Sequence, residues 1–431
     1  MKVAIIGAGV VGVATAYELA CDGHEVTVFE RRSAAAEEAS FANAGVVAPG
    51  YVSPWTSSGM TRTLFNQWLH RPTALSINLP LSGSDWNWLK RANRSAKSIV
   101  WQSNRNRMQR LAFYSRERLD HLVDNLSLEF EASQGLLLLL RSAEDHKRAQ
   151  AELQQWQAVG VVGADISAAQ AYALEPALNT RIPLVAAIHL ANDGVANCRQ
   201  FVLLLRRKAQ LLGVNFEFNT AVASLKAAYP ATLLVSINGS SKLTERAFDQ
   251  VVVCAGVGAG ALLKSLGLAI PMATVYGHSV SATIGETINA PRSAVIDERY
   301  KIAISKLGQR VRVSGAAGLG GSIHVKNSAP LQTLYKILQD WFPSAALFSG
   351  SDPRVGRNLG AGVQEWKGAY LVMPDGPPLI GASGVPGVWL NVGHGAHGWA
   401  LACGSARALA DLMAGRTPHI DMEGLGVDRL R

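Results

Sequence analysis

The sequence opens with an alternation of apolar runs and glycines that few folds accommodate. An apolar run over Val3–Ile6 predicts a buried parallel strand. Three glycines of a short turn follow, Gly7, Gly9 and Gly12, and the next residues predict a helix over Val13–Asp22. A second apolar run ends at Glu30. The chain therefore begins as strand, tight turn, helix and strand, which is how a doubly wound α/β sheet starts.

Each glycine of this turn has a physical role in binding a dinucleotide. Gly7 permits the tight turn, Gly9 lets the backbone approach a pyrophosphate, and Gly12 lets the helix pack closely on the strand. The helix N-terminus, with the N–H groups of Val10 and Val11, presents donors and a positive dipole end to the phosphates. An ordinary strand–turn–helix unit does not require glycine at all three positions, so the sequence favours dinucleotide binding.

The acidic residue at the end of the second strand narrows the choice of nucleotide. Glu30 lies 18 residues beyond Gly12, where a carboxylate accepts hydrogen bonds from ribose hydroxyls. An acid at this position fits an adenosine with a free 2′-hydroxyl, which predicts FAD or NAD rather than NADP. Arg31, the next residue, is expected to contact the same end of the nucleotide.

Length and composition exclude several classes of protein. The 431 residues are enough for two domains, and no run of about 18 apolar residues predicts a transmembrane helix. The four cysteines are scattered without C-x-x-C or metal-ligand spacing, so we expect no metal and a reduced, cytoplasmic protein. The first strand begins so early that it leaves no room for a signal peptide.

The formal charge of +9 is concentrated in one segment. The range from Arg62 to Arg118 holds eleven Lys and Arg against two acids, and four of the ten tryptophans fall in it: Trp68, Trp86, Trp88 and Trp101. This mixture is typical of a surface that docks on a membrane, and it predicts peripheral association with the inner face of the cell membrane. A solvated basic helical face with inward-packed Trp explains it equally well. No nucleic-acid motif accompanies the charge, so we expect no nucleic-acid partner.

The remaining pattern predicts an α/β protein whose dinucleotide domain is discontinuous. Nucleotide-like segments occur at residues 1–60, 190–270 and 355–431, and residues 61–189 and 271–354 are left to form a second, mixed-sheet domain that binds substrate. Helices are expected over Ala143–Val159, Arg199–Leu212, Leu331–Trp341 and Trp399–Ala414.

Two further glycine-rich stretches are candidates to contact a flavin. Small residues and backbone amides after Glu30 can line its pyrophosphate and ring edge, and the turn Gly393–Gly398 directs N–H groups and a helix dipole at an acceptor. That turn has a helix cap as its alternative interpretation. The predicted cofactor contacts in these stretches, with Gly256 after a central strand, are Ser40, Asn43, Ala44, Gly45, Val46, Gly256, Gly393, His394, Gly395, Gly398 and Trp399.

In these motifs the sequence resembles the D-amino acid dehydrogenase small subunits, within the D-amino acid oxidase and glycine oxidase superfamily. The fingerprint Gly7–Gly12, Ser40–Gly50, Tyr300–Ile304, Met373–Gly376 and Gly393–Ser405 fall in the family's order and spacing. The resemblance implies FAD and a D-amino acid oxidase-like fold with a Rossmann-like FAD domain. It also implies hydride transfer from an amine-bearing carbon to flavin N5, giving an imine that hydrolyses to a keto product. A quinone or respiratory-chain electron acceptor at the inner membrane is implied as well.

One position departs from the family pattern. The family's Arg, which pairs with the substrate carboxylate, is replaced by Tyr370, which cannot supply charge. Either another cation takes over, with Arg312, Lys306, Arg357 and His397 as candidates, or the substrate lacks a free α-carboxylate. The predicted catalytic residues are Tyr300, which matches a family position near the substrate, together with Tyr370 and His397.

Several functions remain open at this point. The leading one is oxidation of the C–N bond of a D-amino acid or related amine. The alternatives are an oxidase that reduces O2, a flavoprotein whose catalysis is altered, and a dehydrogenase that uses a nicotinamide alone.

Overall fold

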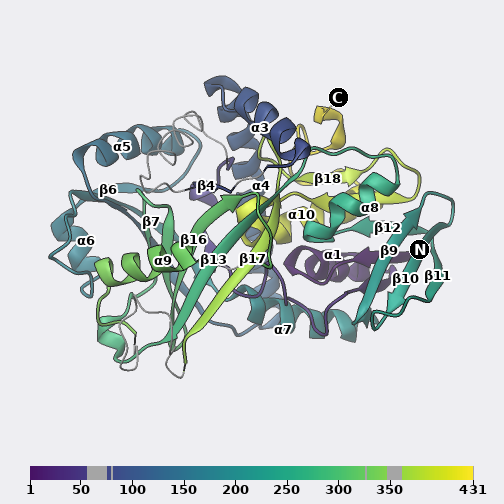
Figure 1. Cartoon of the computed structure of the whole chain (residues 1–431), viewed down its shortest axis with the longest axis horizontal. Coiled ribbons are helices and arrows are strands. Elements are labelled where there is room, and N and C mark those ends of the chain that lie inside the picture. The colour runs from purple at the N-terminus through teal and green to yellow at the C-terminus, as the bar shows by residue number, and fades with distance from the viewer. Residues whose placement is uncertain (56–74, 79–80, 326–327, 347–361, 431) are drawn as a thin grey trace.

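Two β-sheets side by side organise the chain in the computed structural model (Figure 1). It describes residues 1–55, 75–78, 81–325, 328–346 and 362–430. The six-stranded sheet has the order β18-β19-β12-β1-β2-β8, and the ten-stranded sheet follows the path β17-β13-β16-β15-β14-β5-β7-β3. Both chain ends lie on the side of the six-stranded sheet.

The six-stranded sheet is parallel except for one edge strand, β18. Its strands are β1 (Lys2–Ile6), β2 (Glu25–Phe29), β8 (Asn215–Glu217), β12 (Gln250–Val253), β18 (Leu379–Ala382) and β19 (Val388–Val392). They come from the beginning, the middle and the end of the chain, as the discontinuous pattern predicts. Strand β1 is central, so the turn that follows it lies at the carboxyl edge of the sheet, where α/β proteins bind their ligands.

Alternate residues of β1 face two different layers. Val3 and Ile5 pack against the helical layer, whereas Ala4 and Ile6 pack against a three-stranded antiparallel sheet and α8 (Ala259–Ser265). The helical layer consists of α1 (Val10–Cys21), α4 (Ser98–Leu126), α7 (Cys198–Leu211) and α10 (Gly398–Met413). The small sheet is β9 (Thr220–Lys226), β10 (Ala231–Ile237) and β11 (Leu243–Phe248). Because both faces are covered, β1 and β12 are continuous apolar runs.

The ten-stranded sheet is mixed and curves between two helical covers. Leu137 and Leu139 of β5 face the side covered by α9, and Leu136 and Leu138 face α5. The strands are β3 (Val46–Val47), β4 (Leu75–Ile77), β5 (Ala132–Leu140), β6 (Ala164–Ser167), β7 (Ala186–Ala196), β13 (Ala273–Thr283), β14 (Ala294–Asp297), β15 (Ile302–Leu307), β16 (Arg310–Leu319) and β17 (Gln364–Val372). The helices of this part are α3 (Gly83–Ser95), α5 (Ala143–Gln157), α6 (Ala168–Leu174) and α9 (Ser328–Trp341).

The four helices expected from periodicity are present, and their ends differ from the prediction by no more than three residues. The first helix begins at Val10, three residues before the predicted start, because Gly9 is already its N-cap. The division into two domains stays a proposal. Strand β17 lies within the segment 355–431 yet pairs with β13 in the ten-stranded sheet, and α4 packs on the helical layer of the other sheet.

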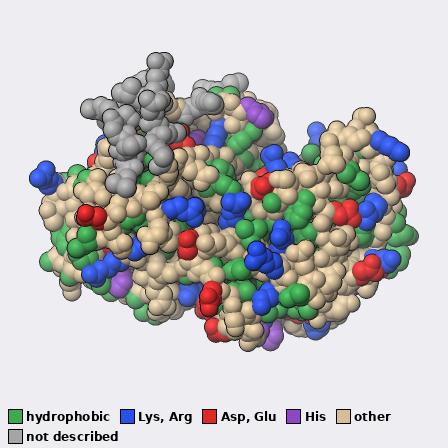
Figure 2. Space-filling view, turned by 90° about the horizontal axis from the view of Figure 1, so that it is seen from below, with side chains coloured by type: hydrophobic (Ala, Val, Ile, Leu, Met, Phe, Trp, Pro, Cys, Tyr) green, Lys and Arg blue, Asp and Glu red, His purple; other side chains and the backbone are tan. Residues whose placement is uncertain are grey.

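Charge is dispersed over the face seen in Figure 2, where Lys and Arg are interspersed with Asp and Glu. The formal excess of +9 is therefore not gathered into one patch on that face. Among the helices that the structure describes, none is long and apolar enough to cross a membrane.

Candidate active site

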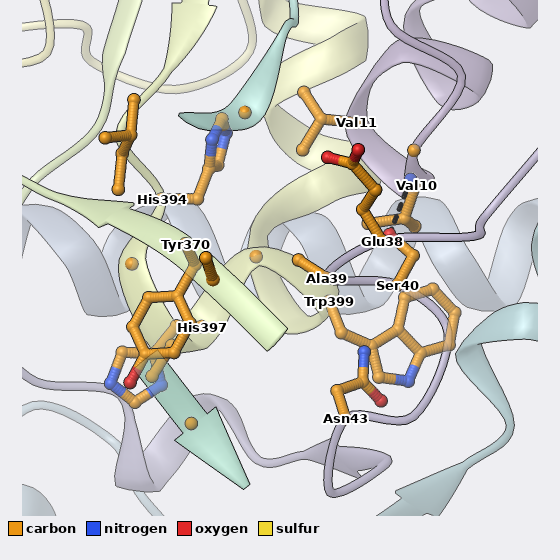
Figure 3. A pocket seen from close by; sticks show the side chains of 18 of the residues that line it. Val10, Val11, Glu38, Ala39, Ser40, Asn43, Tyr370, His394, His397 and Trp399 are labelled. Carbon is orange, nitrogen blue, oxygen red and sulfur yellow. Dashed lines mark hydrogen bonds between the residues drawn. The ribbon is translucent and has the colours of Figure 1, made fainter. Parts of the chain in front are cut away.

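A cavity of about 1070 Å³ lies at the carboxyl edge of the six-stranded sheet and extends over the ten-stranded sheet. Small-molecule pockets have volumes of roughly 300–1,000 Å³, so this one has room for a dinucleotide and a small second ligand. Seventeen of the 18 predicted cofactor-binding residues line it, from Gly7 to Trp399. Tyr370 and His397 line it as well (Figure 3).

Gly12, the remaining residue of that set, does not line the cavity and serves the close packing of α1. A Cβ atom at Gly12 would stand 1.9 Å from the carbonyl oxygen of Gly7, so only glycine lets α1 lie this close to the turn. Gly7 itself has a φ of +106°, and a Cβ there would stand 2.6 Å from the Cys254 carbonyl oxygen. The two glycines together bring the N-terminus of α1 to the edge of the cavity.

The first turn of α1 is prepared for an anionic ligand. The Val10 N–H donates to Ser40 Oγ at 3.0 Å, the contact drawn dashed in Figure 3. No side chain caps the helix at Gly9, and Val11 also faces the cavity. The other orphan N–H groups of this first turn and the helix dipole are therefore available to a phosphate.

Glu30 is held in place by the backbone beside the turn. Its two carboxylate oxygens accept the N–H groups of Ala8 and Arg32, each at 2.8 Å. A carboxylate oxygen has a second lone pair, so both can still accept a ribose hydroxyl. Arg31 pairs through two hydrogen bonds with Glu38, at 2.8 and 2.6 Å, and both side chains line the cavity.

The loop at Asn43–Val46 is held in place by side chains of the ten-stranded sheet. The Asn43 side chain accepts the Gly45 N–H at 3.0 Å, and Ser305 Oγ donates to the Ala44 carbonyl at 3.0 Å. Arg312 donates to the Asn43 carbonyl at 3.0 Å and to Ser281 Oγ at 2.8 Å. Arg312 is therefore buried under the loop, outside the cavity lining, and its donors hold protein oxygens.

The second glycine-rich turn follows β19 at the same carboxyl edge of the sheet and also lines the cavity. Gly393 has a φ of +82°, and a Cβ there would stand 2.8 Å from Met373 Cγ. His394 is buried, its Nε2 lies 3.1 Å from Ser405 Oγ, and burial lowers its pKa to about 3. Trp399 in the first turn of α10 donates to the Ala196 carbonyl at 3.0 Å.

His397 and Tyr370 are neutral hydrogen-bonding groups at the cavity wall. Burial lowers the pKa of His397 to about 4, and a hydrogen bond with the Ser53 backbone only partly opposes this shift. Burial raises the pKa of the Tyr370 phenol, which also hydrogen-bonds with Trp55. At neutral pH neither group carries a charge, so His397 does not provide the cation that Tyr370 lacks.

The third predicted catalytic residue, Tyr300, is not brought to this cavity. Its ring packs on the α9 side of the ten-stranded sheet, 5.4 Å from Arg141 Cζ. Lys306 is also absent from the lining and borders a separate depression near Pro291. Arg357 lies outside the described residues. Tyr300 and Lys306 therefore do not contribute to the lining of this cavity.

The sequence prediction missed the far end of the cavity, between α4, α5 and the β14–β15 turn. Lys301 in that turn makes a close ion pair with Glu298, and Tyr51 donates to Glu298 at 3.0 Å. Burial lowers the pKa of Lys301 to about 8. Arg105 of α4 lies between the rings of Trp101 and Trp156, 5.5 and 5.3 Å from their centroids. The sequence contained one signal for this part of the cavity: Trp101 and Arg105 lie four residues apart, on the same face of one helix.

Two properties limit the chemistry of the site. In the described part of the chain, no group of three or more His, Cys, Asp or Glu is placed to hold a metal ion. The cavity walls are rich in aromatic rings, which come from Tyr51, Trp55, Trp101, Trp156, Trp366, Tyr370 and Trp399. Aromatic walls of this kind suit the orientation of an organic ligand.

Comparison with known proteins agrees with this geometry. The FAD dependent oxidoreductase (DAO) family matches residues 2–412. The chain belongs to this family. A D-amino acid dehydrogenase of Cereibacter sphaeroides is 37% identical over the whole chain and 95% of its own length. The protein of the same name from Bradyrhizobium diazoefficiens is 35% identical over the whole chain and 99% of its own length. The resemblance drawn from the motifs is confirmed.

Solved structures show the same fold at low identity. Glycine oxidase from Geobacillus kaustophilus superposes with a TM-score of 0.74 at 19% identity, covering 99% of this chain and 98% of its own. L-proline dehydrogenase from P. horikoshii gives 0.71 at 18% identity, covering 100% and 97%. The predicted D-amino acid oxidase-like fold is therefore confirmed, and the chain is an oxidoreductase of an FAD-dependent family.

Proposed function

We propose that the protein binds FAD and oxidises the C–N bond of a D-amino acid, giving an imine that hydrolyses to a keto acid. One observation carries the proposal: the dinucleotide cradle and an aromatic-walled space belong to one continuous cavity. The name of the relatives that match over their whole length, D-amino acid dehydrogenase, supports the choice of substrate.

The residues around the cradle fit FAD. The N-terminus of α1 and Ser40 would hold the pyrophosphate, and Glu30 the ribose of the adenosine. A side chain at Gly7 or Gly393 would collide with its neighbours, so both positions keep the backbone close to the cavity. The N–H groups at the start of α10 would face the ring that gains negative charge. When bound, FAD supplies the acceptor for the hydride of the substrate α-carbon.

The chain's own residues position the substrate and keep the site uncharged around the reacting carbon. Tyr370 and Trp55 form one wall, and the Tyr370 hydroxyl is a donor at all physiological pH values because burial raises its pKa. His397 is a neutral imidazole, so it does not repel the incoming ammonium group. His278, also in the lining, has a buried Nε2 that hydrogen-bonds with no other described residue and can accept a hydrogen bond from the substrate amine.

An anaerobic reduction screen tests this function. The purified flavoprotein is mixed with D-amino acids, L-amino acids and amines without a carboxylate, and bleaching near the flavin absorption maximum is followed. We expect D-amino acids to bleach it fastest. Bleaching only by carboxylate-free amines would replace the proposed substrate class, and bleaching by none of them would refute the function. Oxygen consumption during turnover then separates an oxidase from a dehydrogenase.

We further propose that electrons leave to a quinone or respiratory-chain acceptor at a membrane, where the protein docks through α3 and the start of α4. Trp86, Ile99 and Val100 expose 53%, 83% and 43% of their surface there. Four exposed cations lie among them without ion pairs to other described residues: Lys90, Arg91, Arg94 and Lys97. Trp88 is buried instead and donates to the Val372 carbonyl, and Trp68 lies outside the described residues.

Liposome flotation tests the docking surface. Reversing Lys90, Arg91, Arg94 and Lys97 to Glu is expected to release the protein from anionic vesicles, since each basic residue near such a surface contributes about 1 kcal/mol. The matched control reverses four exposed cations elsewhere, Arg207, Lys226, Lys242 and Lys264. Equal loss of binding in both variants would mean that net charge, and not this surface, is responsible.

A further inference from the structure

Arg105 is a buried cation that forms no ion pair with any other described residue. Only 4% of its surface is exposed, and its guanidinium lies between the faces of Trp101 and Trp156. Its buried Nε has no hydrogen-bond partner, and none of the ion pairs or hydrogen bonds found among the described residues involves its guanidinium. A buried charge without a partner carries a large desolvation cost, so a site of this kind is built for an anion from outside the chain.

The neighbouring cations are already paired with other acids. Lys301 binds Glu298, and Arg148 and Arg299 both bind Asp145, at 3.0 and 2.7 Å. The negative charge of Glu152 acts to raise the pKa of Arg105, yet the two side chains form no ion pair. Among the described residues that line this cavity, Arg105 is therefore the buried guanidinium whose charge is left for a ligand.

The position of Arg105 connects it to the proposed substrate space. One turn further along α4, Gln109 donates to the Gly50 carbonyl at 3.0 Å, which fixes the helix against the turn at Pro49–Tyr51. The Tyr51 ring meets the Trp156 ring edge to face, at 6.2 Å between centroids. Two residues beyond Tyr51, the Ser53 backbone hydrogen-bonds with His397. Continuous contacts thus lead from Arg105 to the start of α10.

We propose that Arg105 binds the carboxylate of the amino acid substrate, in place of the cation that is missing at Tyr370. The inference rests on the proposed function. Two of the cations considered from the sequence do not line the cavity: Arg312 holds the Asn43 loop, and Lys306 lies outside the lining. Because the two Trp rings cover the faces of the guanidinium, its N–H groups are left at the edge, where a planar carboxylate accepts two parallel hydrogen bonds.

Ligand binding without turnover gives the most direct test. Binding of benzoate and of its neutral analogue benzamide is measured by perturbation of the flavin absorption spectrum of the oxidised holoenzyme. Arg105→Met is expected to weaken benzoate binding by about 10- to 150-fold, the effect of losing a hydrogen bond to a charged group. Benzamide binding is expected to change by less than about threefold. The control Arg116→Met removes a cation of the same helix that pairs with Asp120, and is expected to leave both ligands unaffected.

Two further variants separate recognition from folding. Arg105→Lys keeps the charge but not the planar fork, and an intermediate benzoate affinity is expected. Arg105→Ala is expected to regain benzoate binding in the presence of ethylguanidinium, which a purely structural role of Arg105 does not predict. Flavin content and thermal unfolding are measured for every variant.

The outcomes distinguish this inference from the proposed function. Equal benzoate affinities of the wild type and the Met variant overturn the assignment of Arg105, even when D-amino acids bleach the flavin. Loss of benzoate but not benzamide binding supports it, even when no amino acid bleaches the flavin. With a D-amino acid as reductant, the Met variant is expected to show a raised KM, whereas the corresponding amide is oxidised as well as by the wild type.

Discussion

Replacing Gly12 by Ala sets two known effects against each other. Alanine favours a helix over glycine by about 1 kcal/mol, so propensity alone predicts a more stable protein. The added Cβ, however, would lie 1.9 Å from the Gly7 carbonyl oxygen, more than an ångström inside the 3.0 Å that real Cβ contacts respect. The obstructing atom belongs to the backbone of a tight turn, which cannot move aside as a flexible side chain does. We expect the steric effect to win.

The size of the effect follows from what must move. Overpacking of a tight contact costs about 1–3 kcal/mol, and the rigid neighbour places Gly12→Ala at the upper end of that range. Displacing α1 by about an ångström also moves the N–H groups of Val10 and Val11. A charged hydrogen bond contributes about 1.5–3 kcal/mol, so loss of one such bond weakens FAD binding by roughly 10- to 150-fold.

Fluorescence titration of the apoprotein with FAD, and flavin release on heating, measure both consequences. The control is Gly260→Ala in α8, where an added Cβ meets nothing within 4 Å. This control is expected to be neutral or to gain about 0.4–1 kcal/mol, with unchanged FAD affinity. If Gly12→Ala binds FAD as tightly as the wild type and is no less stable than the control, the reasoning from close approach is refuted.

Three further substitutions have defined outcomes, and Lys336→Met and Glu25→Gln serve as controls for two of them. Arg407→Met removes the partner that Glu18, Asp22 and Asp411 share between α1 and α10, and should cost about 3 kcal/mol in urea unfolding at pH 7. Although burial opposes the shift, hydrogen bonds from Arg407 and Arg416 lower the pKa of Asp22 in the folded protein. The difference in unfolding free energy between this variant and the wild type should therefore shrink as pH falls below 3.8. A difference independent of pH would contradict this. The exposed pair removed by Lys336→Met should cost less than about 1 kcal/mol. Tyr370→Phe loses one neutral hydrogen bond and should raise the KM for a D-amino acid by up to about 10-fold, equally at pH 6 and pH 9 because the pKa of the phenol is raised; a pH-dependent effect in stopped-flow reduction would show that it ionises. Glu30→Gln should weaken FAD binding by about 10-fold through loss of a charged acceptor, whereas Glu25→Gln, at an exposed site, should not.

Tyr300 and Lys301 are adjacent in the chain but lie on opposite sides of the ten-stranded sheet. The family motif directed attention to the tyrosine, but Lys301 adopts a φ of +51° in the turn before β15. The Tyr300 ring goes to the α9 face, and Lys301 lies on the cavity face with Glu298. A turn conformation that reverses the direction of successive side chains cannot be read from apolar periodicity, because it depends on the pairing of β14 with β15.

The candidate nucleotide-binding half of the site was predicted from the sequence alone. The three glycines, the helix start and Glu30 lie within thirty consecutive residues, and their spacing is a property of local backbone geometry. The proposed substrate half depends on the tertiary structure. Arg105, Tyr51 and Lys301 come from three distant segments, and only the packing of α4 against the Pro49–Tyr51 turn brings them to one cavity. Burial leaves Arg105 without an ion-pair partner among the described residues, whereas Arg312 is occupied by protein oxygens; such burial is a property of the assembled chain that no single segment contains.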